Sequence, residues 1–128
     1  MKRFSIFLVI IILFSGCAYN SFDEVEEIPA PINPNATYQK HTVTASGMVF
    51  TPSSLTISVG DTVVFDNVSG FHNVNCTQAT FPTNPASFDN GAVATDPWTF
   101  TFVFTIVGNY NYQCDAHAPG MAGTITVQ

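Results

Sequence analysis

The sequence predicts an all-β domain, a Greek-key β-sandwich or barrel of seven to eight strands, over residues 38–128. Twelve Phe and four Tyr, together with many Thr and Val, favour strands over helices. Eight Gly and eight Pro indicate frequent turns between short runs in which apolar and polar residues alternate. The 128 residues suffice for one hydrophobic core, so a multidomain enzyme is excluded.

Residues 1–16 are expected to form a signal peptide that exports the protein to the cell envelope or periplasm. An apolar run follows Lys2 and Arg3, and it is shorter than the roughly 20 residues that a membrane-spanning helix needs. The small residues before Cys17 resemble the lipobox of bacterial lipoproteins, which predicts that Cys17 is lipidated and anchored to a membrane. An ordinary signal peptide followed by an incidental cysteine is the alternative.

Residues 17–37 are acidic and rich in proline, and they are interpreted as a tether between the anchor and the domain. Three Lys and Arg residues stand against nine Asp and Glu residues in the whole chain, for a formal net charge of −6. Nucleic-acid binding requires clustered basic residues that neutralise phosphates. The charge balance therefore excludes nucleic acid as a partner.

Three runs at the start of the domain predict strands, at residues 41–44, 54–59 and 62–65. Gly60 and Asp61 separate the second run from the third. Because a two-residue linker of this kind is typical of a tight turn, the sequence predicts a β-hairpin here.

Residues 71–75 predict a fourth strand, whereas the polar stretch 75–97 carries no periodicity and receives no assignment. Farther along, Phe100, Phe102 and Phe104 alternate with Thr and Val, so that one face of this strand is aromatic. An aromatic strand face is expected to be buried.

The last two predicted strands flank the most informative loop of the chain. Tyr110, Tyr112 and Cys114 alternate with polar residues, which places Cys114 on the same face as two aromatic rings. Residues 123–127 predict the closing strand. The segment between them is therefore a short loop that begins at a cysteine.

Potential metal ligands gather in this loop. Cys114, His117 and Met121 offer a thiolate, an imidazole and a thioether within eight residues, and His72 is the other imidazole in the middle of the domain. Two His, one Cys and a weak axial Met form the ligand set of a type 1, blue copper site, because thiolate favours Cu(I) and imidazole accepts Cu(II). Zinc is the weaker alternative, since structural zinc sites prefer more thiolates and a thioether is a poor zinc ligand.

The sequence resembles the plastocyanin-like small blue copper proteins of the cupredoxin family from about His41 to the C-terminus. Gly-Phe-His-Asn-Val at 70–74 is similar to the segment that carries the family's first histidine ligand, and Tyr-Gln-Cys-Asp-Ala-His at 112–117 with Met-Ala-Gly-Thr at 121–124 is similar to its ligand loop. The resemblance implies a cupredoxin-like sandwich that binds one copper, with Asn73 steadying the ligand loop. The implied ligands are His72, Cys114, His117 and Met121.

The remaining His, Cys and Met residues of the domain receive structural interpretations. His41 belongs to neither copper motif and is expected to be exposed, and Met48 is expected to lie in the core. Cys76 would share a strand face with His72 if the strand continued, where a second thiol could compete for copper, but a buried free thiol is the preferred reading.

The resemblance implies a one-electron carrier rather than an enzyme, with His117 as the electron port within a small apolar patch. Gln113 and Asp115 flank Cys114, where copper enzymes that pass electrons to a second copper centre have a histidine. The acidic chain predicts redox partners with a basic docking face, and a monomer is expected. Copper storage or delivery in the envelope is the first alternative, and an Ig-like structural lipoprotein is the second.

Overall fold

The computed structural model describes residues 33, 35–95 and 97–128, so the predicted signal peptide, Cys17 and most of the predicted tether lie outside the described residues. The described residues contain no helix that is long and apolar enough to cross a membrane. They form seven strands, which are β1 (Lys40–Ser46), β2 (Val49–Thr51), β3 (Ser54–Ile57), β4 (Thr62–Asn67), β5 (Trp98–Val103), β6 (Gly108–Gln113) and β7 (Ala122–Val127).

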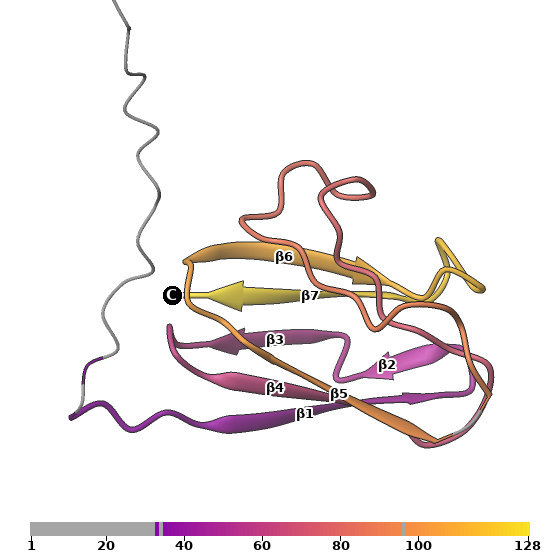
Figure 1. Ribbon diagram of the computed structural model, residues 1–128, viewed down its shortest axis with the longest axis horizontal. Helices are drawn as coiled ribbons and strands as arrows, with labels where there is room; N and C mark the ends of the chain where they lie inside the picture. The colour runs from indigo at the N-terminus through magenta and orange to yellow at the C-terminus, as the bar shows by residue number, and fades with distance from the viewer. Residues whose placement is uncertain (1–32, 34, 96) are drawn as a thin grey trace, which may run out of the picture.

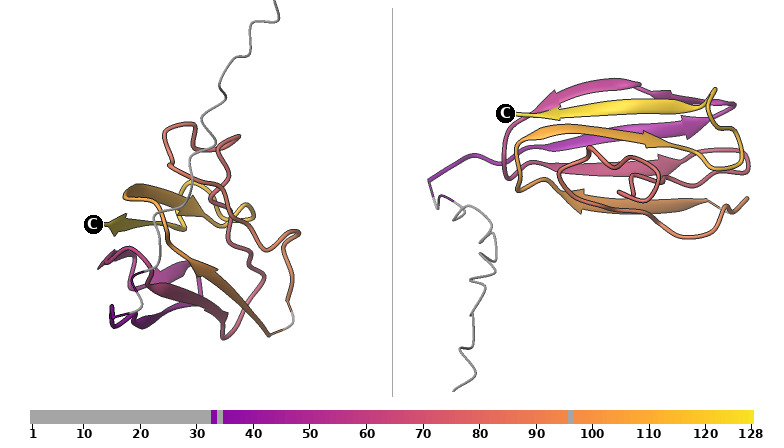
Figure 2. Two further views of the ribbon diagram at one scale, coloured as in Figure 1. Left: turned by 60° about the vertical axis from the view of Figure 1, so that its left-hand side comes forward. Right: turned by 90° about the horizontal axis from the view of Figure 1, so that it is seen from above.

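The strands form two sheets that pack face to face, as the predicted β-sandwich requires (Figures 1 and 2). One sheet has the order β2-β1-β4-β5 and the other the order β3-β7-β6. The pairs β1–β4 and β3–β7 are parallel, whereas the other pairs are antiparallel. The all-β prediction is confirmed.

Aromatic side chains fill the space between the sheets. The ring of Tyr112 on β6 meets the rings of Phe50 and Phe65 edge to face, with centroids 5.0 Å and 5.2 Å away. Edge-to-face contacts of this kind add stabilisation beyond the burial of apolar area. The sequence predicts that Tyr110, Tyr112 and Cys114 share one strand face, and the structure shows that all three side chains are buried.

The aromatic face around β5 is only partly enclosed. Phe104 is fully buried, but Phe100 and Phe102 are half-buried. Phe88, from the stretch that received no assignment, packs against Phe102 with ring centroids 4.6 Å apart. The sequence thus predicted the aromatic stripe correctly and overestimated its burial, because β5 is an edge strand with a loop segment as its cover.

The predicted hairpin between residues 54–59 and 62–65 is wrong. β3 pairs with β7 and β4 pairs with β1 and β5, so the intervening turn carries the chain from one sheet to the other. The turn itself is tight, since the amide of Asp61 donates to the carbonyl of Ser58 at 3.0 Å. A tight turn uses the same residue types whether it joins two strands of one hairpin or connects one sheet to the other, so the sequence does not distinguish the two cases. Here β3 and β4 belong to different sheets, so their apolar side chains face each other across the core instead of lying on neighbouring strands of one sheet.

Residues 71–75 do not form the predicted fourth strand. They make only isolated bridges, from His72 to Ala94 and from Asn75 to Asp89 and Gln113. The following stretch covers the free edge of β6, where the buried Asn84 side chain accepts from the amide of Asn111 at 3.0 Å and donates to its carbonyl at 2.8 Å. An amide side chain therefore replaces a paired strand at this edge.

Two further expectations are wrong. Met48 lies at the β1–β2 turn and is 64% exposed, so it is not a core residue. A turn of two residues between antiparallel strands leaves no neighbouring layer to cover its side chain. His41 is half-buried rather than exposed, and its ring bonds Asp61.

Candidate metal centre

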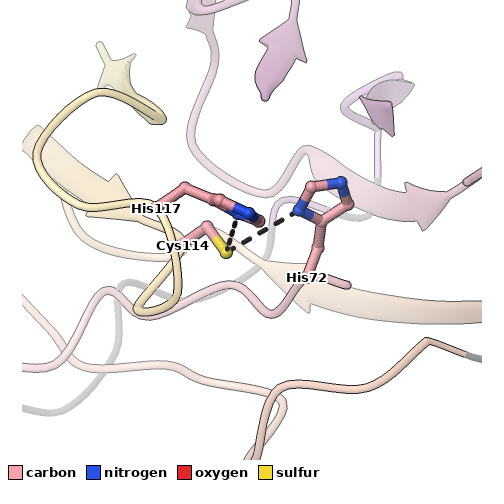
Figure 3. Close-up of side chains that lie close together, drawn as sticks. All are labelled: His72, Cys114 and His117. Carbon is pink, nitrogen blue, oxygen red and sulfur yellow. Dashed lines mark hydrogen bonds between the residues drawn. The ribbon is translucent and has the colours of Figure 1, made fainter. Parts of the chain in front are cut away.

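Three donor side chains converge at one end of the sandwich, beside the β6–β7 loop (Figure 3). Cys114 directly follows β6, His117 lies in the β6–β7 loop, and His72 lies in the segment that follows β4. The Sγ of Cys114 is 3.4 Å from Nδ1 of His117 and 3.8 Å from Nδ1 of His72. The three candidate donor atoms all lie within 4.8 Å of one another.

Three hydrogen bonds hold the backbone of His72 in place. Its amide and its carbonyl both bond Ala94 at 3.0 Å, and the indole of Trp98 donates to the same carbonyl at 3.2 Å. The side chain is 1% exposed. Burial lowers the pKa of His72, and a positive charge on His117 lowers it further. His72 therefore favours the neutral form that binds metals.

The ligand loop closes on itself through backbone hydrogen bonds. The amide of Cys114 donates to the carbonyl of Met121 at 3.0 Å, and the amide of Met121 donates to the carbonyl of His117 at 3.0 Å. Met121 is buried, at 1% exposure. The closure sets the Met121 backbone directly beside Cys114, and the predicted role of Met121 as a fourth ligand requires this proximity.

A second set of contacts joins the loop to the segment that carries His72. Asn73 accepts a hydrogen bond from the amide of Asp115 at 2.8 Å and donates to its carboxylate at 2.7 Å. Burial raises the pKa of Asp115, but hydrogen bonds from Asn73, Asn75 and Gln113 outweigh it and hold that pKa below 3.8. The loop is thus fixed to its neighbour at the residue after Cys114.

The donor set fits copper. One thiol and two imidazole nitrogens face one another in a buried site, and a buried thioether residue closes the loop. Residues 37–128 match the family of copper-binding proteins described as the plastocyanin/azurin family. The chain belongs to this family. Its cofactor is copper, and a type 1 site is the site that these donors fit.

Relatives in the plastocyanin/azurin family cover most of the domain. Plastocyanin from Scenedesmus fuscus is 36% identical over 89 residues, which are 66% of this chain and 91% of that protein. Chloroplastic plastocyanin from Tetradesmus obliquus is 30% identical over 105 residues, 76% of this chain and 70% of that protein. Among solved structures, an oxidised amicyanin variant superposes with a TM-score of 0.57 at 29% identity, covering 70% of this chain and 82% of the other.

The copper site of this family member also involves residues that the sequence did not single out. Asn75 donates to the Asp115 carboxylate at 2.9 Å and pairs with Gln113 through its backbone. The sequence contains a second asparagine two positions after Asn73, but this spacing alone does not predict that both side chains face the ligand loop.

Cys76 is the buried free thiol that the preferred reading expected. The strand that would have aligned it with His72 is absent, and Cys76 does not belong to the donor cluster. Its sulfur accepts a hydrogen bond from Nδ2 of Asn84 at 3.1 Å within the core.

Proposed function

We propose that this protein carries single electrons on one copper ion held by His72, Cys114, His117 and Met121. A bound copper supplies a one-electron Cu(I)/Cu(II) couple. The observation that carries the proposal is the convergence of three donor atoms within 4.8 Å, on segments that backbone hydrogen bonds already hold in place. Donors fixed in this way need little rearrangement when the charge of the metal changes. Electron carriage without catalysis also fits a chain whose relatives are plastocyanins.

The proposed ligands differ in burial, which suggests separate roles in binding copper and in passing electrons. Cys114 and His72 are buried and would exclude water from a bound copper, whereas His117 is half-buried and remains partly open to solvent. His117 is the proposed electron port. The loop residues around it are exposed and small, which suits a flat and transient contact. They are Ala116, Ala118, Pro119, Gly120 and Ala122.

Redox partners are proposed to present a basic face. The chain has nine acidic residues against three basic ones, and two of the three bases lie in the predicted signal peptide. Opposite charge on the partner raises the rate of encounter, and salt screens this effect. The rate of electron transfer to a basic partner should therefore fall as ionic strength rises, and a rate independent of salt would oppose this part of the proposal.

The protein is proposed to work as a monomer in the cell envelope, anchored through a lipid on Cys17. The described chain enters β1 at the end of the sandwich opposite the β6–β7 loop, so a tether leaving there keeps the donor cluster free (Figure 1). A Cys17→Ser variant should lose incorporation of labelled fatty acid and move from the membrane fraction to the soluble one. Unchanged labelling would oppose the anchor.

Spectroscopy of the full chain tests electron carriage. Addition of Cu(II) should produce an intense thiolate-to-copper absorption band and a narrow EPR hyperfine splitting, both abolished by ascorbate and restored by oxidation. Cys114→Ser should abolish the band, whereas Cys76→Ser should retain it. A colourless protein, or one that releases copper to a mild chelator, would favour copper delivery instead.

A further inference from the structure

We propose that the carboxylate of Asp115 is a positioning group for the copper site, which fastens the ligand loop to the His72 segment and lowers the reduction potential through its fixed negative charge. This inference rests on the proposed electron-transfer function. It concerns the acidic residue directly after the candidate thiolate ligand.

Asp115 and Asn73 form a closed pair of hydrogen bonds. The amide of Asp115 donates to Oδ1 of Asn73 at 2.8 Å, and Nδ2 of Asn73 donates to Oδ2 of Asp115 at 2.7 Å. Nδ2 of Asn73 also donates to the carbonyl of Gly91 at 3.0 Å. Asn73 is 1% exposed, so its ends of these bonds are buried, whereas Asp115 lies at the surface.

The second carboxylate oxygen of Asp115, Oδ1, also accepts hydrogen bonds. Nδ2 of Asn75 donates to Oδ1 of Asp115 at 2.9 Å, and Nε2 of Gln113 lies 3.4 Å from the same atom. Asn75 is itself fixed, because its amide and carbonyl bond Gln113 at 2.9 Å and 3.0 Å. A carboxylate that accepts from two amide side chains forms stronger hydrogen bonds than a neutral acceptor.

Each member of the closed pair is the neighbour of a candidate ligand. Asn73 follows His72 and Asp115 follows Cys114, so the pair sets the separation of two donors that are 42 residues apart in the chain. A neutral side chain could hold the loop through its backbone amide alone. The carboxylate adds the side-chain bonds and a charge.

The charge has a predictable sign. Both oxygens of the Asp115 side chain accept hydrogen bonds from amide N–H groups, which is the arrangement of an ionised carboxylate. A nearby negative charge stabilises the more positive of two metal states. Cu(II) is favoured over Cu(I), which lowers the reduction potential. Asp115 is itself exposed, so what distinguishes it from other surface carboxylates is its position directly after Cys114 and the amide hydrogen bonds that fix both of its oxygens.

Two variants separate this role from a general effect of charge. Asp115→Asn removes the charge and turns an amide donor toward the donors of Asn73 or Asn75. Asp89→Asn is the matched control. It removes the same charge from an exposed residue that bridges to Asn75, and whose carboxylate accepts from the amide of Gly91 at 2.8 Å rather than from the ligand loop.

The full chain should be measured in both the copper-loaded and the copper-free form. We expect a more positive reduction potential for Asp115→Asn than for the wild type and for Asp89→Asn, with an altered EPR hyperfine splitting. Asp115→Glu should restore part of the shift. In the copper-free protein, Asp115→Asn should accelerate hydrogen exchange at the amide of residue 115 by about tenfold, the effect of losing one net hydrogen bond.

The outcomes distinguish this inference from the proposed function. Equal potentials in Asp115→Asn and Asp89→Asn would overturn it, and so would unchanged exchange at residue 115. If the wild type lacks a reversible blue band, the proposed function fails. The exchange measurement on the copper-free protein still tests whether Asp115 holds the loop.

Discussion

Nε2 of His41 lies 3.0 Å from Oδ2 of Asp61. The start of β1 and the β3–β4 turn, to which these residues belong, lie at the end of the sandwich opposite the β6–β7 loop (Figure 1). The same carboxylate accepts hydrogen bonds from the amides of Gln39 at 2.8 Å and Ser58 at 3.0 Å. Asp61 is 4% exposed. One buried acidic group therefore ties the entry to β1 to the corner between β3 and β4.

Asp61→Asn should destabilise the protein at neutral pH by roughly 1–3 kcal/mol, because the amide group faces donors that now lack an acceptor. Burial raises the pKa of Asp61, but hydrogen bonds from Gln39, His41 and Ser58 outweigh it and hold the pKa below 3.8. A lowered acidic pKa stabilises the fold above the ordinary value, and this stabilisation is lost as the pH falls through the folded-state pKa.

The free energy of unfolding, measured by denaturant titration between pH 7 and pH 2.5, checks this prediction. The difference between wild type and Asp61→Asn should narrow below about pH 4. Asp66→Asn is the control, because Asp66 is half-buried on β4 and lies outside the hydrogen-bond cluster around Asp61. If the difference in unfolding free energy between wild type and Asp61→Asn stays constant down to pH 2.5, the stabilising role of the Asp61 carboxylate is contradicted.

Gly70→Ala should disturb the metal site. Gly70 has a φ of +104°, and a Cβ built on it would lie 2.5 Å from Nε2 of His72. Gly91 has a similar φ of +87° with nothing within 4 Å of its Cβ position, so Gly91→Ala carries the backbone strain without the collision. Each variant should lose roughly 1–3 kcal/mol of stability. Only Gly70→Ala should also weaken copper binding, as measured by competition with a chelator.

Cys76 should be inert in the folded protein. Burial raises the pKa of its thiol to about 12, so the reactive thiolate is almost absent at neutral pH. Site-resolved mass spectrometry after iodoacetamide treatment should find Cys76 modified only when denaturant is present. Modification under native conditions at a rate like that of a free thiol would show that the core around Asn84 opens readily.

The two buried tyrosines of β6 should respond differently to loss of their hydroxyl groups. The Tyr110 hydroxyl donates to the carbonyl of Ile106 at 2.9 Å, whereas the buried Tyr112 hydroxyl has no hydrogen-bond partner among the described residues. Tyr110→Phe should cost about 1 kcal/mol, and Tyr112→Phe should be neutral or stabilising. Thermal unfolding of both variants decides the point, and a larger loss for Tyr112→Phe would reveal an ordered water at that hydroxyl.

The sequence alone was sufficient to predict the features that depend on neighbours along the chain. Alternation placed Tyr110, Tyr112 and Cys114 on one buried face, and the spacing to His117 and Met121 defined a short loop of donors. These features follow from the two-residue period of a strand and from the ligand chemistry of the side chains.

Only the tertiary structure decided which distant segments meet. The turn at Gly60 leads to the opposite sheet, the stretch after Asn75 covers the edge of β6, and Asp115 bonds two asparagines about 40 residues away. Local sequence specifies faces and turns, but strand partners are selected by burial across the whole domain. The predicted hairpin therefore failed, whereas His72, Cys114 and His117, three of the four predicted ligands, lie within 4.8 Å of one another.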